Sequence, residues 1–118
     1  REKYETSFMT SRARFEYYQQ KRVAREELHN CSPTYSWVCE AAGVTEPLLH
    51  RAQMIRVPVM LCQAIQDTIV VLEDQERFIK KVPDGKLVKF DAKHELYSSH
   101  DEVLGDYVNQ IIDFMSEE

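Results

Sequence analysis

The spacing of apolar residues along the chain changes near Arg56, from a helical pattern to short continuous runs. Ser11–Leu28 contains no glycine or proline and places its aromatic residues at helical spacing, which predicts a helix with Ser11 as N-cap. Thr34 is expected to cap a short helix ended by Gly43, and Thr45–Pro47 to start another. The predicted inner face of the short helix is formed by Trp37, Val38 and Ala41.

The second part of the chain predicts two strands and two helices. Val57–Cys62 is a nearly continuous apolar run, typical of a strand buried on both faces of a parallel sheet. A helix over Glu73–Lys81 separates it from a second strand, Lys86–Phe90, and a helix with a strong apolar stripe starts near Asp101. A strand, helix, strand order requires parallel pairing through a crossover, so the fold class is α/β.

Two parallel strands alone leave sheet edges and faces uncovered. The sequence therefore predicts that further strands stand beside these two, or that the exposed edge supports a homodimer or strand exchange. No apolar run approaches the roughly 18 residues of a membrane-spanning helix, and Arg1–Thr10 does not resemble a signal peptide.

The charge distribution bounds the partners of the chain. Residues 1–30 carry seven Lys/Arg and five Asp/Glu (+2), and the remainder carries eight and fifteen (−7), which gives the net charge of −5. This acidity argues against nucleic acid as a partner. The mildly basic start could contact anionic lipid headgroups, although a solvated helix face is the favoured interpretation.

The three cysteines, Cys31, Cys39 and Cys62, show no CxxC spacing and are expected to be reduced thiols in a cytoplasmic-type compartment. No paired ligand motif supports a metal site, and no cofactor is expected.

The candidate catalytic residues come shortly after the two predicted strands in the sequence. Asp67 comes a few residues after the first strand and His94 after the second. The carboxyl ends of parallel strands share one edge of the sheet, so the two side chains are expected to meet there. An acid that orients a histidine, which in turn accepts a proton from a serine, forms a Ser-His-Asp triad. Taken singly, Asp67 is a typical turn residue and His94 a typical surface residue; Asp91, Asp101 and His100 are alternatives.

A nucleophile with its usual surroundings is absent from the sequence. Gly43, Gly85 and Gly105 are the only glycines, and none flanks a serine in a G-x-S-x-G pattern. Tyr35 and Trp37 are candidate substrate-binding residues, with helix packing as the favoured alternative.

Several segments resemble the C-terminal third of α/β-hydrolase lysophospholipases, a group related to monoglyceride lipases and to the serine aminopeptidase S33-type hydrolases. They are RVPVMLCQAIQDTIV, AKHELYSSHDEVLGDYVNQIIDFM and, matching the lysophospholipase L2 branch more specifically, SPTYSWVCEA. The resemblance implies that residues 1–44 form a helical cap or lid segment and residues 45–118 the C-terminal part of the hydrolase core. It also implies that Asp67 and His94 are the catalytic acid and base. Ala64 departs from the family's G-x-x-D motif, and Val71–Leu72 replaces a polar pair.

The resemblance implies a serine carboxylic-ester hydrolase acting on a lysophospholipid or monoacyl ester, with the serine upstream of this chain. Such a parent enzyme is expected to be cytoplasmic, with possible peripheral contact at the inner membrane. Alternatively, the chain is a non-catalytic fragment or assembly domain, because a base and its orienting acid complete no acyl transfer without a nucleophile.

Overall fold

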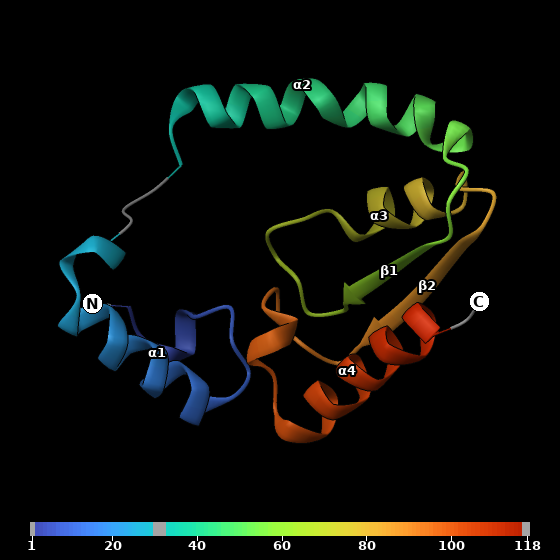
Figure 1. The fold of residues 1–118 in the computed structure, drawn as a ribbon. Coiled ribbons are helices and arrows are strands. Elements are labelled where there is room, and N and C mark those ends of the chain that lie inside the picture. Colours follow the sequence, from blue (N-terminus) through green and yellow to red (C-terminus); the bar gives the residue numbers. More distant parts are fainter. Residues whose placement is uncertain (1, 30–32, 117–118) are drawn as a thin grey trace.

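The computed structural model describes residues 2–29 and 33–116 and has a mixed α/β fold, as the sequence predicts (Figure 1). The regular elements, in chain order, are α1 (Arg12–Ala24), α2 (Tyr35–Arg51), β1 (Val59–Ala64), α3 (Leu72–Ile79), β2 (Gly85–Phe90) and α4 (Asp101–Ser116). Short 3₁₀ helices lie at Tyr4–Thr6, Glu26–Leu28, Ala52–Met54 and Leu96–Ser98. Within the described ranges, none of the helices has the length and apolar character that crossing a bilayer requires.

The two strands lie side by side and run in the same direction, which confirms the predicted parallel pairing. Val59 is opposite Gly85 at the start of the pair, and Ala64 is opposite Phe90 at its end. Helix α3 connects them and returns the chain to the starting edge, so both strands end at the same edge of the sheet (Figure 1). Among the described residues the sheet has these two strands alone, and β1 has no hydrogen-bonded strand on its other side.

Alternate side chains of each strand point to opposite faces of the sheet and join two different apolar clusters, as the two-residue period of a strand requires. On one face, α3, the turn after it and the 3₁₀ helix at Ala52–Met54 pack against Val59, Leu61 and Leu87. On the opposite face, α4 packs against residues that alternate with these; Phe90 of β2 meets Tyr107 of α4 edge to face, with ring centroids 5.5 Å apart. The sheet is therefore covered on both faces, while its edges are open within the described chain.

Gly85 allows β2 to start very close to the end of α3. A β-carbon at this position would lie 2.6 Å from the backbone oxygen of Ile79 and 3.1 Å from that of Val82. Glycine is thus required here by close approach, and its backbone φ is not positive.

Helix α1 begins where the sequence predicts and ends earlier. The Ser11 side chain accepts a hydrogen bond from the Arg14 N–H at 3.4 Å, as an N-cap does. The helix ends at Ala24, and a 3₁₀ turn replaces its expected last residues. Phe15 is buried on its inner face.

The predicted break at Gly43 is wrong, because helix α2 continues through this residue. A single helix runs from Tyr35 to Arg51, with the Thr34 side chain accepting from the Trp37 N–H at 3.2 Å. Gly43 ends a helix only when it adopts a left-handed conformation, and here it does not. Pro47 is tolerated inside the helix at the loss of one backbone hydrogen bond. The division of the chain into residues 1–44 and 45–118 stays a prediction.

The predicted inner face of α2 is also wrong. Trp37 is 63% exposed and Val38 48% exposed, whereas Leu49, near the other end of the helix, is buried. Only the last turns of α2 approach α3, and the first turns project beyond the sheet (Figure 1). The apolar stripe of its first half consequently contacts little of the described chain.

Candidate functional site

The hydrogen bonding between the strands continues into the loops that follow them. The Ile65 N–H donates to the Phe90 carbonyl at 3.0 Å, and the Gln66 N–H donates to the Ala92 carbonyl at 3.0 Å. The Gln66 side chain also donates to Asp91 Oδ1 at 2.6 Å. These contacts fix the loop after β1 against the loop after β2, directly before the two candidate residues.

Asp67 and His94 meet beyond the C-terminal ends of β1 and β2. The distance between His94 Nδ1 and Asp67 Oδ2 is 2.7 Å, as in a strong charge-assisted hydrogen bond. The Asp67 side chain is 5% exposed, whereas that of His94 is 40% exposed. The acid is thus buried behind a histidine that faces solvent. Asp91 and Asp101, the alternative acids, contact Gln66 and Arg14 instead.

The two oxygens of Asp67 serve different purposes. Oδ1 accepts from the N–H groups of Ile69 at 2.7 Å and Val70 at 3.3 Å, which shapes the loop as an Asx-type turn. Oδ2 holds His94. Asp67 therefore forms the turn through one oxygen and holds the His94 ring through the other.

These contacts determine the ionisation of the carboxyl. Burial alone would raise the pKa of Asp67, but the hydrogen bond from His94, the Ile69 and Val70 N–H groups and the charge of His94 together lower it below its usual value. The carboxyl is therefore ionised at neutral pH. An ionised carboxylate only accepts hydrogen bonds, so Nδ1 of His94 carries the proton. In the neutral imidazole, Nε2 is then left as a proton acceptor.

A small cavity of about 90 Å³ adjoins the histidine. Its lining includes Thr6, Ser7 and Phe8 of the N-terminal segment, and Gln66, Thr68 and Lys93 from the two loops. The Ser7 hydroxyl donates to the Tyr4 carbonyl at 2.8 Å and is itself buried, so it is engaged in the local turn. Ser98 and Ser99 are also buried.

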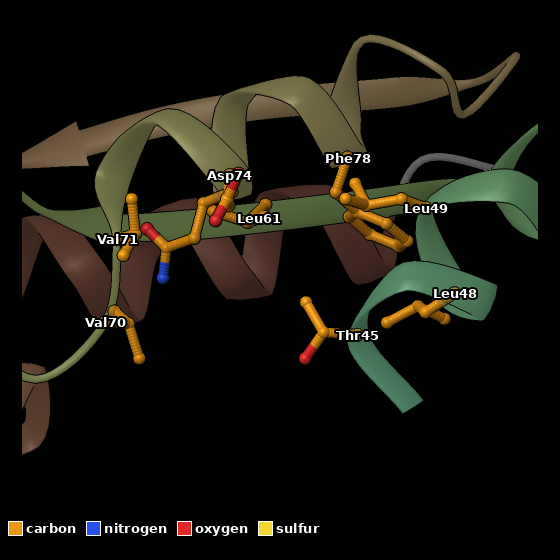
Figure 2. Close-up of a pocket in the computed structure, with 9 residues that line it drawn as sticks. Thr45, Leu48, Leu49, Leu61, Val70, Val71, Asp74 and Phe78 are labelled. Atoms are coloured by element: carbon orange, nitrogen blue, oxygen red, sulfur yellow. The ribbon is translucent and has the colours of Figure 1, made fainter. Parts of the chain in front are cut away.

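A larger cavity of about 530 Å³ lies between α2, α3 and the loop after Asp67. Figure 2 shows Leu48, Leu49 and Phe78 toward one end of it and Val70 and Val71 toward the other. Leu61 of β1 forms part of its wall, so most of the lining is aliphatic or aromatic. Val70 lines this cavity and also belongs to the turn held by Asp67, three positions before it in the chain. The turn therefore connects the cavity to the acid.

The other sequence candidates lie apart from this site. Tyr35 is 93% exposed at the start of α2, and neither Tyr35 nor Trp37 lines one of the two cavities above; their role in substrate binding stays a prediction. Cys39 and Cys62 are unpaired, and Cys31 is outside the described residues. Burial raises the pKa of the Cys62 thiol. In the described part of the chain, His, Cys, Asp and Glu residues form no cluster of three that could hold a metal ion.

Sequence reasoning missed the N-terminal contribution to the site. The ring of Phe8 packs edge to face against the ring of His94, with centroids 6.1 Å apart. A contact between residues more than eighty positions apart has no local periodicity or motif that reveals it.

No family model, curated protein or solved structure matches this chain significantly.

Proposed function

We propose that this chain is the C-terminal part of an α/β-hydrolase and supplies the acid and base of a Ser-His-Asp triad. The observation that carries the proposal is the 2.7 Å contact between Asp67 and His94 at the shared carboxyl edge of two parallel strands. The arrangement matches the Asp-then-His order of the α/β-hydrolases. Asp67 orients the imidazole, and Nε2 of His94 takes the proton of a serine and returns it to the leaving group.

The nucleophile belongs to polypeptide outside this sequence, which has no G-x-S-x-G elbow. The open edge of β1 and the exposed apolar stripe of α2 support further structure packing against the chain. In the parent enzyme, the strand beside β1 and the elbow would come from that structure.

The proposed substrate is a lysophospholipid or a similar monoacyl ester. This assignment rests on the resemblance of Pro33–Val38 and its neighbours to the lysophospholipase L2 branch. The aliphatic cavity beside Val70 and Val71 is compatible with an acyl chain, since ligand pockets are mostly apolar and of this size. The proposed parent enzyme acts in the cytoplasm, with peripheral contact at the inner membrane surface.

Replacement of His94 tests the proposal in the full-length protein. His94→Ala should abolish hydrolysis of a lysophospholipid or monoacyl ester, because the serine then loses its general base. His100→Ala is the matched control; it removes an exposed histidine six positions away and should leave turnover unchanged. Unchanged turnover in His94→Ala would refute the role of the histidine.

A specific alternative is that the chain is an assembly domain without catalysis in its parent. The open edge of β1 favours it, since such an edge pairs readily with a second copy or another chain. A fluorophosphonate probe separates the two functions. The proposal expects labelling of the full-length protein and none of the 118-residue chain; an unlabelled full-length protein would support the assembly domain.

A further inference from the structure

The segment before α1 and the first residues of α1 lie along the loop that carries His94. We name residues Ser7–Arg14 the strap and Asp91–Ser99 the histidine loop. The Glu95 N–H donates to the Phe8 carbonyl at 3.1 Å, and the Ser11 N–H donates to the Ser98 carbonyl at 3.1 Å. One backbone bond therefore lies directly beside His94, and the other lies near the end of the loop.

Two cationic side chains add to these backbone bonds. Lys93 Nζ donates to the Ser7 carbonyl at 3.0 Å, on the N-terminal side of His94. Arg14 Nη1 donates to the Ser99 carbonyl at 2.8 Å, and its Nη2 reaches Asp101 Oδ1 at 2.6 Å. The strap thus contacts the histidine loop on both sides of the imidazole.

Phe8 contacts the imidazole itself. Its ring lies edge to face against the ring of His94, with an interplanar angle of 75°. Asp67 fixes one ring nitrogen of His94, but a single hydrogen bond leaves the ring free to rotate about it. A ring packed against the imidazole restricts that rotation, and such aromatic contacts stabilise a geometry beyond their area of contact.

The strap is itself held in place by the chain around it. The Tyr4 hydroxyl donates to the Thr10 carbonyl at 2.6 Å, and the Tyr4 ring packs against Phe15 of α1 with centroids 5.6 Å apart. Ser7 and Ser11 are buried. A braced segment of this kind can transmit rigidity to the loop that it contacts.

We infer that the strap positions His94 for proton transfer, with Phe8 and Arg14 as its positioning residues. For its kinetic consequence the inference rests on the proposed function. A base must be held close to its productive geometry, and small displacements lower turnover without removing a reacting group. Residues within the segment expected to form a cap thus hold the histidine directly.

The first test needs no hydrolytic activity. Carboxyl NMR titration of the 118-residue chain follows the pKa of Asp67 in the unmodified chain, Phe8→Ala, Arg14→Gln and the control Tyr17→Ala. The His94 contact lowers the pKa of Asp67, so a loosened histidine should raise that pKa in the first two variants. Tyr17 is exposed, packs on Lys21 and should leave the titration unchanged when truncated.

The second test uses the full-length protein. Phe8→Ala and Arg14→Gln should each lower kcat about 2- to 10-fold, the range that a single aromatic or hydrogen-bonding contact supplies. KM should change less than about twofold, because neither residue is proposed to bind substrate.

The outcomes separate the inference from the function that it refines. An unchanged Asp67 titration in both variants, with the thermal unfolding midpoint preserved, would overturn the positioning role. Arg14→Gln keeps the inference testable if truncation of Phe8 unfolds the chain. A full-length protein without esterase activity would contradict the proposed function, while the NMR comparison would still decide whether the strap holds the histidine.

Discussion

The Asp67→Asn substitution gives the sharpest test of what the carboxylate does. It changes the atom that faces His94 and keeps an oxygen at the position that accepts from the turn. Asparagine keeps the shape of the side chain. Its amide oxygen can still accept from Ile69 and Val70, so the turn should survive. Its NH₂ group then faces His94, where the carboxylate accepted a hydrogen bond.

The expected loss of stability is modest. The charge-assisted bond contributes about 1.5–3 kcal/mol, and a tautomer switch that lets Nδ1 accept from the amide recovers about 0.5–1.5 kcal/mol. The free energy of unfolding should thus fall by about 1–2 kcal/mol at pH 7. The loss of turnover in the full-length protein should be far larger, about 10⁴-fold, because the same switch places the proton on Nε2 and removes the base.

Urea unfolding of the 118-residue chain from pH 2 to 8 measures the free energy of unfolding. Ester hydrolysis by the full-length protein measures the turnover. The fold lowers the pKa of Asp67, so the stability contributed by its ionised form is fully present above the unfolded pKa of about 3.9. It is lost as the pH falls through the lower folded pKa, so the curves of Asp67→Asn and the unmodified chain should converge there.

Asp91→Asn makes the same chemical change in the neighbouring loop and should alter neither quantity, since its oxygen can still accept from Gln66. Turnover by full-length Asp67→Asn within tenfold of the unmodified full-length protein would refute the tautomer argument. A stability difference that does not shrink as the pH falls below the unfolded pKa would refute the assignment of that difference to the charge.

Two further predictions concern the packing that positions the loops. Gly85→Ala places a methyl group 2.6 Å from the Ile79 carbonyl oxygen and should destabilise the chain by about 1–3 kcal/mol in thermal unfolding. Gly43→Ala, which meets nothing within 4 Å in the described chain and lies in a helix, should instead stabilise it by about 0.5–1 kcal/mol; equal midpoints for the pair would contradict the close approach. Gln63→Leu removes a buried amide that donates to Gln75 at 3.0 Å, and urea unfolding should show a loss of about 1–3 kcal/mol; stability equal to that of the unmodified chain would mean that the buried bond contributes nothing.

The core of the fold could be predicted from the sequence because its signals are local. The apolar run of Val57–Cys62, the helix after it and the second strand form a strand, helix, strand order, and such a crossover joins parallel strands. That pairing in turn places Asp67 and His94 at one edge, and the structure confirms that they meet. The strand bounds shift by up to two residues, because the ladder is set by register and not by composition.

The remaining features depend on contacts that composition does not encode. Gly43 predicts the end of one helix and Thr45–Pro47 the start of another, but Gly43 does not take the left-handed conformation that would end α2, and the helix continues through Pro47. The contact between Phe8 and His94 joins two segments through tertiary packing, and Phe8 has no neighbour in sequence that marks it as part of the site.

The shared carboxylate of Asp67 also makes one backbone amide a reporter of the imidazole. Any event that draws electron density or a proton toward Oδ2 changes how strongly Oδ1 accepts from the Ile69 N–H. The chemical shift of the Ile69 amide should therefore change when His94 gains a proton or a ligand binds to it. A single resonance in an ordinary amide spectrum would then record the protonation state of the His94 imidazole.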